Sequence, residues 1–226
     1  MQFDFPDENG KPYKSSGGKM VWNETLKKDI PCDWKIVSLS DIVDYNLERV
    51  AVNDISTNDY YTPIEVIPRK KMSLCEAMPL ENAASGLCRY KKRDILLSNR
   101  RVYFHKICIA PFNGLTRDTV MVLRPKDTEL LGFVYETMFT DAFIGYATKV
   151  SYGSLQPVLS WTEAKKYKVL LPSHGLSKRY SKIIDGLIEK VLTSQIEIIT
   201  LSKQRDELLP LLMNGQVTVN YHLSDD

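Results

Sequence analysis

The chain has 226 residues, of which 43% are hydrophobic and 10% aromatic, and its 30 basic residues stand against 28 acidic ones. This composition excludes a disordered chain and suffices for one substantial core. Apolar stretches are short and the first ten residues are polar and acidic, so we expect a cytoplasmic protein with neither a transmembrane span nor a secretory signal. The cysteines Cys32, Cys75, Cys88 and Cys108 form no CxxC pair, which favours reduced thiols over a disulfide framework.

The first predicted element is a segment without periodicity. Residues 6–20 are rich in Pro, Gly, Ser, Asn and Lys, so we assign residues 1–30 to a linker or extended arm. Over residues 31–173, short apolar runs rich in β-branched and aromatic residues alternate with turn signals, which indicates a mixed sheet. The predicted strands lie within the runs WKIVSL, ISTNDYYTPIEVI, DILLS, ICIAPF and VMVLRP.

One amphipathic helix is predicted against this sheet, over residues 130–146. Its apolar residues recur at helical spacing, and Gly145 stands near its end. The face expected to pack on the sheet carries Leu131, Val134, Tyr135, Met138 and Phe139. The sequence therefore predicts an α+β domain over residues 31–173.

A long helix is predicted over residues 174–215, because seven of nine heptad seam positions are apolar and only Ser194 and Arg205 are exceptions. The apolar seam consists of Ile184, Leu187, Val191, Ile198, Leu201, Leu208 and Leu212. A rod of roughly 50 Å exceeds the core of this domain, so we expect a partner helix on much of the seam. The alternative is a core helix that only caps the sheet. Pro210 and the Asn214-Gly215 pair are expected to end the helix, before a short strand and tail over residues 216–226.

Motifs for catalysis and metal binding are missing from the sequence. The chain has neither a GxxxxGK[ST] phosphate loop nor a GxGxxG run, and His105, His174 and His222 lack the spacing of a zinc site. We therefore expect no catalysis by this chain, no metal and no cofactor. Glu163 and Lys165 match a fragment of a metal-dependent nuclease site, but TEAKKYK is more simply interpreted as a solvated short helix or turn.

A basic run over residues 89–106 dominates the charge pattern, with seven Lys or Arg against one acid, Asp94. Such a local asymmetry is typical of a surface that binds nucleic-acid phosphates. Asn99, Arg100 and Arg101 follow the predicted strand DILLS, where a loop would present them to base edges. A solvated charged face is the alternative interpretation. A second basic cluster consists of Arg69, Lys70 and Lys71.

The order of these motifs resembles the specificity subunit of type I restriction-modification systems, with one target-recognition domain and its spacer helix. YKKRDILLSNRRVYFHKICIA is similar to the family's segment with a strand, Ser-Asn, Arg and Tyr, and Arg93 stands where the family usually has glycine. FDFPDENGKPYKSSGGKMVWN and IPCDWKIVSLSDI resemble the connector into the second recognition domain and its opening strand. GSLQPVLSW and KYKVLLP resemble the last loop and strand, and LSKQRDELLPLLMNGQV resembles the helix terminus.

This resemblance implies a non-catalytic subunit that reads DNA and directs adenine methylation and cleavage by partner methylation and restriction subunits. Asn99, Arg101 and Tyr103 are expected near bases, and the remaining cations on phosphates. The full set of expected DNA contacts is Lys91, Lys92, Ser98, Asn99, Arg100, Arg101, Tyr103, Lys106, Ser154 and Gln156. The helix is expected to pair with a second copy or with the other half of a longer subunit, so that two domains read a split double-stranded target. The alternative is a coiled-coil protein-interaction module that does not read DNA.

Overall fold

A central sheet, most of whose strands are largely apolar in sequence, forms in the computed structural model with the antiparallel order β4-β10-β7-β8. The structure describes residues 3–7, 9–51, 55, 60–78 and 86–216. Alternation along the strands places Ile95 and Leu97 on one face and Leu96 on the other, and both faces are buried. The strands are β4 (Val43–Asn46), β7 (Ile95–Ser98), β8 (Ile107–Ile109) and β10 (Val120–Pro125).

Smaller sheets complete the α+β fold. The sheet β5-β9-β6 supplies Tyr90 to the cluster around Leu96, and its β5 and β9 run parallel, which confirms a mixed arrangement. Antiparallel pairs are formed by β1 with β2 and by β3 with β11. These elements are β1 (Met20–Asn23), β2 (Lys28–Pro31), β3 (Lys35–Ser38), β5 (Tyr60–Tyr61), β6 (Leu87–Tyr90), β9 (Gly114–Arg117), β11 (Lys168–Leu171) and the short helices α1 (Leu39–Ile42) and α4 (Trp161–Ala164).

The strand predicted within ISTNDYYTPIEVI is wrong over most of its described part. Only β5 is a strand, and the chain then turns at Pro63, whose carbonyl accepts a hydrogen bond from the Val66 N–H over 3.2 Å. Proline has no N–H to donate to a neighbouring strand, so it favours the end of β5 over its continuation. Apolar content alone does not reveal this turn.

The single helix predicted over residues 130–146 is two helices, α2 (Leu131–Phe139) and α3 (Asp141–Val150), which follow the one-turn helix η4 (Thr128–Leu130). Thr140 between them is extended, and its hydroxyl accepts a hydrogen bond from the Phe143 N–H over 3.2 Å. This side chain caps α3 and explains the break. The predicted apolar face is confirmed, since Leu131, Val134, Tyr135 and Met138 are buried and Phe139 is partly buried in the main core.

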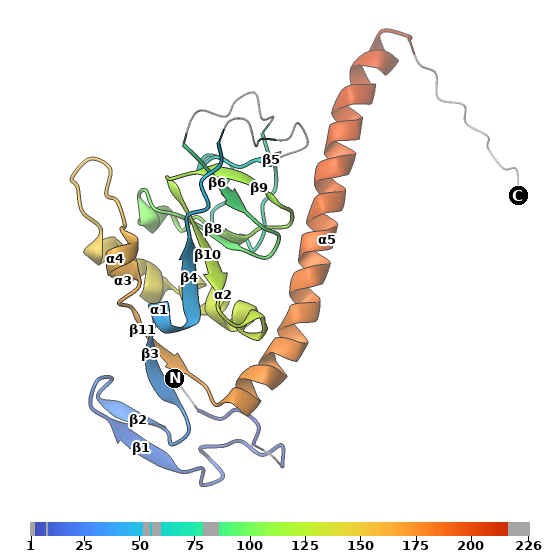
Figure 1. Ribbon diagram of the computed structural model, residues 1–226. Coiled ribbons are helices and arrows are strands. Elements are labelled where there is room, and N and C mark those ends of the chain that lie inside the picture. The colour runs from blue at the N-terminus through green and yellow to red at the C-terminus, as the bar shows by residue number, and fades with distance from the viewer. Residues whose placement is uncertain (1–2, 8, 52–54, 56–59, 79–85, 217–226) are drawn as a thin grey trace, which may run out of the picture.

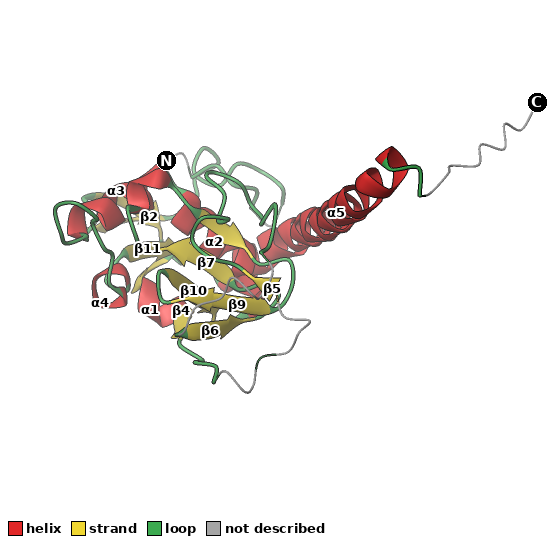
Figure 2. Ribbon diagram, turned by 90° about the horizontal axis from the view of Figure 1, so that it is seen from above, coloured by secondary structure: helices red, strands yellow, loops and turns green. Residues whose placement is uncertain are grey.

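The long helix is confirmed as α5 (His174–Met213), 40 residues or about 60 Å long. Its first half lies along the domain and its second half projects beyond it (Figures 1 and 2). The helix ends at the predicted Asn214-Gly215 pair, but the prediction that Pro210 helps to end it is wrong. Pro210 lies within the last turn, where its carbonyl accepts a hydrogen bond from the Asn214 N–H over 3.0 Å. The chain therefore leaves the helix at Asn214, and the predicted terminal strand lies almost entirely outside the described residues.

The first half of α5 packs on α2 through one face. Ile188 and Leu192 are fully buried in the main core, and Ile184 packs against it. A Cβ built on Gly132 of α2 would lie 2.6 Å from Ile184 Cγ2, so the two helices approach closely because residue 132 has no side chain. The sheet, α2, α3 and the base of α5 thus share one core.

Replacement of Gly132 with Ala is expected to lower the free energy of unfolding by about 1–2 kcal/mol, because the added methyl overpacks against the stiff, β-branched Ile184 and this outweighs the gain in helix propensity. Gly145→Ala is the matched control, since no atom lies within 4 Å of a Cβ there, and it should raise stability by about 0.5–1 kcal/mol. Urea unfolding of both variants measures the difference. A gain of stability in both would contradict the close approach of α2 and α5.

The segment assigned to a linker or arm is more ordered than the sequence analysis predicts. Residues 20–31 form the β1-β2 hairpin at the end of the molecule where α5 begins (Figure 1). Phe5 stacks on Tyr13 and Trp34 with ring centroids 4.8 and 5.4 Å apart, and Arg179 of α5 donates to the Pro6 carbonyl over 3.0 Å. These contacts join residues far apart in the chain, so composition alone does not predict them.

Candidate nucleic-acid interface

Strand β7 divides the basic run into two groups of side chains. Lys91, Lys92 and Arg93 precede this strand, whereas Asn99 and Arg101 follow it. A strand rises about 3.3 Å per residue, so a strand of this length separates the two groups by roughly 13 Å. The two groups of side chains therefore lie at opposite ends of β7.

Ser98, Asn99 and Lys106 make hydrogen bonds inside the domain. Ser98 is 1% exposed and donates from its hydroxyl to the Arg100 carbonyl over 2.9 Å. Asn99 is 8% exposed, and its Nδ2 donates to the Asp118 carbonyl over 2.7 Å. Lys106 Nζ donates to two backbone carbonyls over 2.7 and 3.1 Å, and partial burial lowers the pKa of Lys106. These side chains shape the loop after β7 more than they project from it.

The loop after β7 has an uncommon backbone conformation. Arg101 and His105 have φ values of 47° and 55°, in the left-handed region, on either side of the single turn η3 (Val102–Phe104). Val102 is buried beneath this turn, whereas Tyr103 is exposed. Left-handed non-glycine residues cost of the order of 1–3 kcal/mol each and concentrate at functional sites. The surrounding domain therefore holds Arg101 and Tyr103 in an orientation that an isolated loop would not keep.

Residues 151–158 form a second loop that lies against the first. Tyr152 and Val158 exchange two backbone hydrogen bonds of 3.1 and 2.8 Å, which close the base of this loop. The Arg101 N–H donates to the Pro157 carbonyl over 2.8 Å and joins the two loops. The exposed side chains of the second loop are Tyr152, Ser154, Leu155 and Gln156. The structure therefore brings Ser154 and Gln156 beside the loop of Arg101, as the sequence analysis requires of a shared DNA surface.

The second basic cluster of the sequence lies on the other side of the same loop. The Arg69 guanidinium stands 4.1 Å from the centroid of the Phe104 ring, in cation–π geometry. The Lys70 N–H donates to the His105 carbonyl over 3.1 Å, and Lys71 is exposed beside it. This cluster is visible in the sequence as a basic run, but it is not among the predicted DNA contacts, because only the folded chain joins it to the loop after β7.

These three segments adjoin one another, and we call their exposed and half-exposed side chains the three-loop surface. It combines five cationic side chains with two tyrosines and two neutral hydrogen-bonding side chains. An acid, Asp141, lies at its border, 3.8 Å from Lys70 Nζ and 3.6 Å from His105 Nδ1. The members are Arg69, Lys70, Lys71, Arg100, Arg101, Tyr103, Tyr152, Ser154 and Gln156. Such a surface can pair with phosphates, donate to base edges and stack on flat rings.

The residues before β7 face α5 instead. Lys91 is exposed, but Lys92 Nζ lies 2.8 Å from Glu189 Oε2 on the helix. The hydrogen bond from Lys92, with a second one from Arg93, lowers the pKa of Glu189. Lys92 is therefore committed to a contact within the chain in this structure.

The exposed seam of α5 is the second feature that sequence reasoning singled out. Ile184 faces the domain, whereas the other six seam residues are exposed, Leu187 at 56% and Leu201 at 55%. Contiguous apolar side chains on a surface mark an interaction site. The exposed seam residues are Leu187, Val191, Ile198, Leu201, Leu208 and Leu212.

The structure gives little support to a metal site or to a nuclease site at Glu163. The described residues contain no group of three or more His, Cys, Asp or Glu side chains placed to hold a metal ion. Glu163 lies in the first turn of α4 and pairs with Lys166 Nζ at 2.7 Å, which agrees with its interpretation as part of a short helix. Over the same described ranges, no helix has both the length and the hydropathy that a membrane span requires.

Comparisons with known proteins place this geometry in a family. The chain is 24% identical to the "Type I restriction enzyme MjaIX specificity subunit" of Methanocaldococcus jannaschii, over 92% of this chain and 50% of that one. It thus spans about half the length of the curated relative that it matches. Its fold is similar to the crystal structure of the HsdS subunit from Thermoanaerobacter tengcongensis, with a TM-score of 0.57 and 18% identity over 88% of this chain and 52% of that one.

A second solved structure, the S subunit of a type I restriction-modification system from M. genitalium, matches with a TM-score of 0.47 and 15% identity over 79% of this chain and 45% of that one. The family model for the "Type I restriction modification DNA specificity domain" matches residues 31–205. This range holds the three-loop surface, all strands from β3 to β11 and most of α5, so the chain belongs to the family of type I restriction modification DNA specificity domains.

Proposed function

We propose that this chain reads DNA through the three-loop surface as part of a type I specificity subunit and performs no chemistry itself. The observation that carries the proposal is that three adjoining segments, distant in sequence, bear basic, aromatic and neutral hydrogen-bonding side chains. Cations there neutralise phosphates, while tyrosine and amide groups add neutral contacts. Family membership supplies the class of ligand.

The individual roles follow from the exposure of each side chain. Arg101 and Tyr103 lie on the fixed loop after β7 and contact bases, with Gln156 of the second loop beside them. Arg69, Lys70, Lys71 and Arg100 contact phosphates, and Ser154 and Tyr152 complete the surface. Ser98, Asn99 and Lys106 shape the loop from inside, because their polar atoms bond to backbone carbonyls. Lys91 and Lys92 lie outside this surface.

The partners that we propose act around α5 and the bound DNA. Methylation subunits modify an adenine in the target, and restriction subunits cut the DNA, in the cytoplasm. The exposed seam pairs α5 with the equivalent helix of a second copy or of the other half of a longer subunit. Two recognition domains held apart by this rod read a target split by unread base pairs.

Replacement of Arg101 with Ala tests the proposed base contact. The purified chain first selects its preferred duplex from a random pool, and fluorescence anisotropy then measures affinity for that duplex and for an unrelated one. A lost base contact is expected to weaken binding to the selected duplex about 10–100-fold and to the unrelated one less than about 10-fold. Lys190→Ala, an exposed cation on α5, is the control and should leave both affinities unchanged.

The salt dependence of the same binding discriminates the alternative of a protein-interaction module. Phosphate contacts release counterions, so the affinity for any duplex should fall steeply as salt rises, and Lys71→Ala should reduce the slope by about one contact. Equal losses on both duplexes would make Arg101 a phosphate contact. No measurable affinity for any duplex would contradict DNA recognition by this chain and favour the alternative, in which the exposed seam serves only protein pairing.

A further inference from the structure

Arg93, in the turn before β7, combines an unfavourable backbone conformation with strong side-chain contacts. Its φ of 74° lies in the left-handed region, where glycine is free of strain and arginine is not. The neighbouring turn is fixed by Asp94, whose carboxylate accepts a hydrogen bond from the Lys91 N–H over 2.8 Å and two more from the Arg124 guanidinium, both 2.7 Å. The hydrogen bonds of Asp94 thus stabilise the turn in which Arg93 adopts its strained backbone conformation.

The side chain of Arg93 reaches α5 and binds two of its carboxylates. One guanidinium nitrogen donates to Glu189 over 2.6 Å, and the other pairs with Asp185. Lys92 adds a third charged contact by donating to Glu189 over 2.8 Å. Partial burial alone would lower the pKa of Arg93, but the hydrogen bonds from the two carboxylates outweigh burial and the pKa is raised. We call these four residues the helix clasp.

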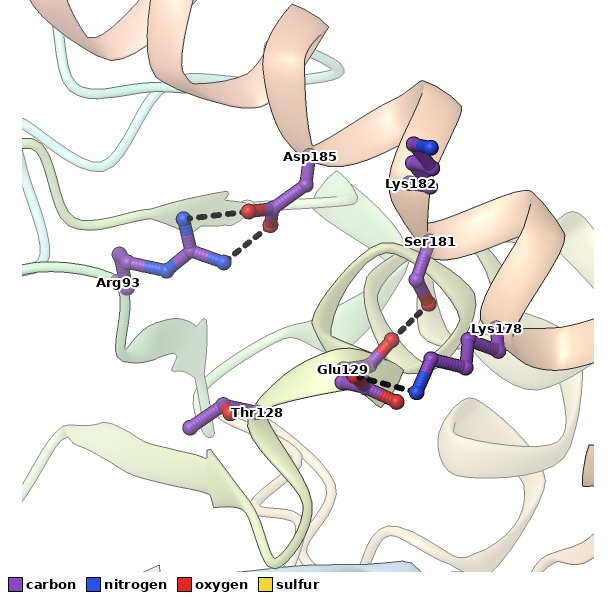
Figure 3. A pocket seen from close by; sticks show the side chains of 7 residues that line it. All are labelled: Arg93, Thr128, Glu129, Lys178, Ser181, Lys182 and Asp185. Carbon is purple, nitrogen blue, oxygen red and sulfur yellow. Dashed lines mark hydrogen bonds and ion pairs between the residues drawn. The ribbon is translucent and has the colours of Figure 1, made fainter.

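A separate tether holds α5 one turn closer to its start. The Ser181 hydroxyl donates to the Glu129 carbonyl, and Lys178 Nζ lies 3.7 Å from the Glu129 carboxylate. Figure 3 shows Arg93 and Glu129 reaching α5 at different points along its axis, at the edge of an open hollow lined by these side chains. The helix clasp and the Glu129 contacts together restrain the tilt of α5, whereas either contact alone would let the helix rotate about one point.

The apolar contacts of α5 hold the helix against the domain, and the helix clasp adds a directional restraint. Ile188 and Leu192 are buried, and this burial fixes the distance of α5 from the domain. Hydrophobic burial is non-directional, however, while an Arg–carboxylate pair prefers a fixed planar geometry. Beyond Leu192 the side chains of α5 leave the domain core, so any tilt near Glu189 grows toward the tip.

We infer that Arg93, supported by Lys92, is a positioning residue that sets the angle between the recognition domain and α5. Its strained backbone directs the guanidinium toward Asp185 and Glu189, and these ion pairs fix the orientation of α5. The angle fixes where the far end of α5 holds its partner. If the chain reads DNA as proposed above, this angle sets the number of base pairs between two half-sites, a consequence that rests on the proposed function.

The test measures the angle without DNA. Spin labels at Lys149→Cys and Gln204→Cys, in a background with Cys32→Ser and Cys75→Ser, report the distance from α3 to the outer part of α5 by pulsed electron resonance. An excess of unlabelled chain limits the signal to distances within one molecule. Residue 204 lies fifteen residues beyond Glu189, or about 22 Å, so a tilt of about 10° moves the label by roughly 4 Å.

The variant Asp185→Asn with Glu189→Gln removes both carboxylate charges and leaves the backbone of Arg93 intact. It is expected to broaden the distance distribution about two-fold or more, since neutral amides bind guanidinium weakly. Raising salt from about 0.1 M to about 1 M should broaden the wild-type distribution and leave the variant unchanged, because the clasp is half-exposed and screened. Circular dichroism checks that every variant folds.

Two further variants serve as controls. Glu207→Gln removes an exposed pair with Lys203 on the same helix and should leave the distribution as in wild type. Arg93→Lys keeps a cation without the planar fork and should give an intermediate width. An unchanged distribution in the Asp185/Glu189 variant, or a wild-type distribution that ignores salt, would overturn the inference. Since DNA is absent, this result is independent of whether the three-loop surface reads DNA.

A DNA arm then tests the consequence for target spacing. On a selected split duplex, one added base pair in the spacer should cost wild type about 10-fold in affinity and the Asp185/Glu189 variant less than about 3-fold, because a looser rod adapts. Affinity for an isolated half-site should not differ between them. If wild type and variant were equally sensitive to spacer length, the link between the helix angle and target spacing would be overturned. If neither protein bound the half-site, the proposed function would fail instead.

Discussion

Replacement of Leu201 with Asp is expected to abolish self-association of the chain while the recognition domain stays folded, as judged by circular dichroism. Leu201 is 55% exposed on the projecting half of α5, so it adds nothing to the core of one molecule. In a symmetric helix pair the residue is lost twice, and burying a leucine contributes about 1.5–3 kcal/mol, so the dimer should weaken more than about 100-fold. Burial of the new carboxylates adds to this loss.

Sedimentation over a wide concentration range measures this effect. Thr200→Asp places the same charge one residue away from the seam and should leave association intact, since the Thr200 side chain only bonds to the Ile196 carbonyl of its own helix. A wild-type chain that stays monomeric at every concentration would contradict pairing with a second copy. The exposed seam would then belong with a helix of the other half of a longer subunit.

Replacement of Asp94 with Ala is expected to lower the free energy of unfolding by about 2–4 kcal/mol. Asp94 is 2% exposed, and its two oxygens accept hydrogen bonds of 2.7 Å from Arg124 and one of 2.8 Å from the Lys91 N–H. Breaking a buried pair costs about 3–5 kcal/mol, and the partial exposure of Arg124 reduces this figure. The hydrogen bonds from Arg124 to Asp94 raise the pKa of Arg124, and the substitution removes this effect. A guanidinium stays charged at neutral pH even without a carboxylate partner, so the variant leaves an unpaired charge.

Urea unfolding at neutral pH measures the Asp94 variant. Asp44→Ala is the matched control, because Asp44 pairs with Lys126 at 3.7 Å with both side chains exposed, and such a pair contributes about 0–1 kcal/mol. Since Asp94 also fixes the turn that carries Arg93, its loss should broaden the distribution of angles between the domain and α5. If both variants lost similar stability, the buried pair of Asp94 with Arg124 would contribute no more than an exposed pair, and the prediction would be contradicted.

Elements whose stability depends on local pattern were predictable from the sequence. The heptad pattern predicts α5, and the apolar runs predict β7, β8 and β10, because side chains near in sequence share a face. The break at Thr140 and the continuation of α5 through Pro210 depend on single hydrogen bonds that periodicity does not register. The aromatic contacts of Phe5 with Tyr13 and Trp34 join segments that are distant in sequence, so the pattern of residues does not reveal them.

The candidate site divides in the same way. The basic run predicts a phosphate-binding surface, and we propose that the loop of Arg101 is a part of it. The sequence does not reveal that Lys92 faces α5 or that Arg69 stacks on Phe104, since these contacts join residues far apart in the chain. Positive charge is visible in a sequence, whereas the partner of each charge is set by the fold.

The sheet that is buried on both faces has a consequence for how this protein can change over generations. Buried residues of the sheet, such as Leu96 and Leu97, tolerate few substitutions, whereas exposed residues at the loop tips, such as Gln156, can be replaced at almost no cost to folding. Freedom is uneven even there, because the left-handed backbone at Arg101 admits few residues besides glycine, asparagine and aspartate without added strain. New specificities should therefore arise first at the tip of the 151–158 loop, and only later at Arg101.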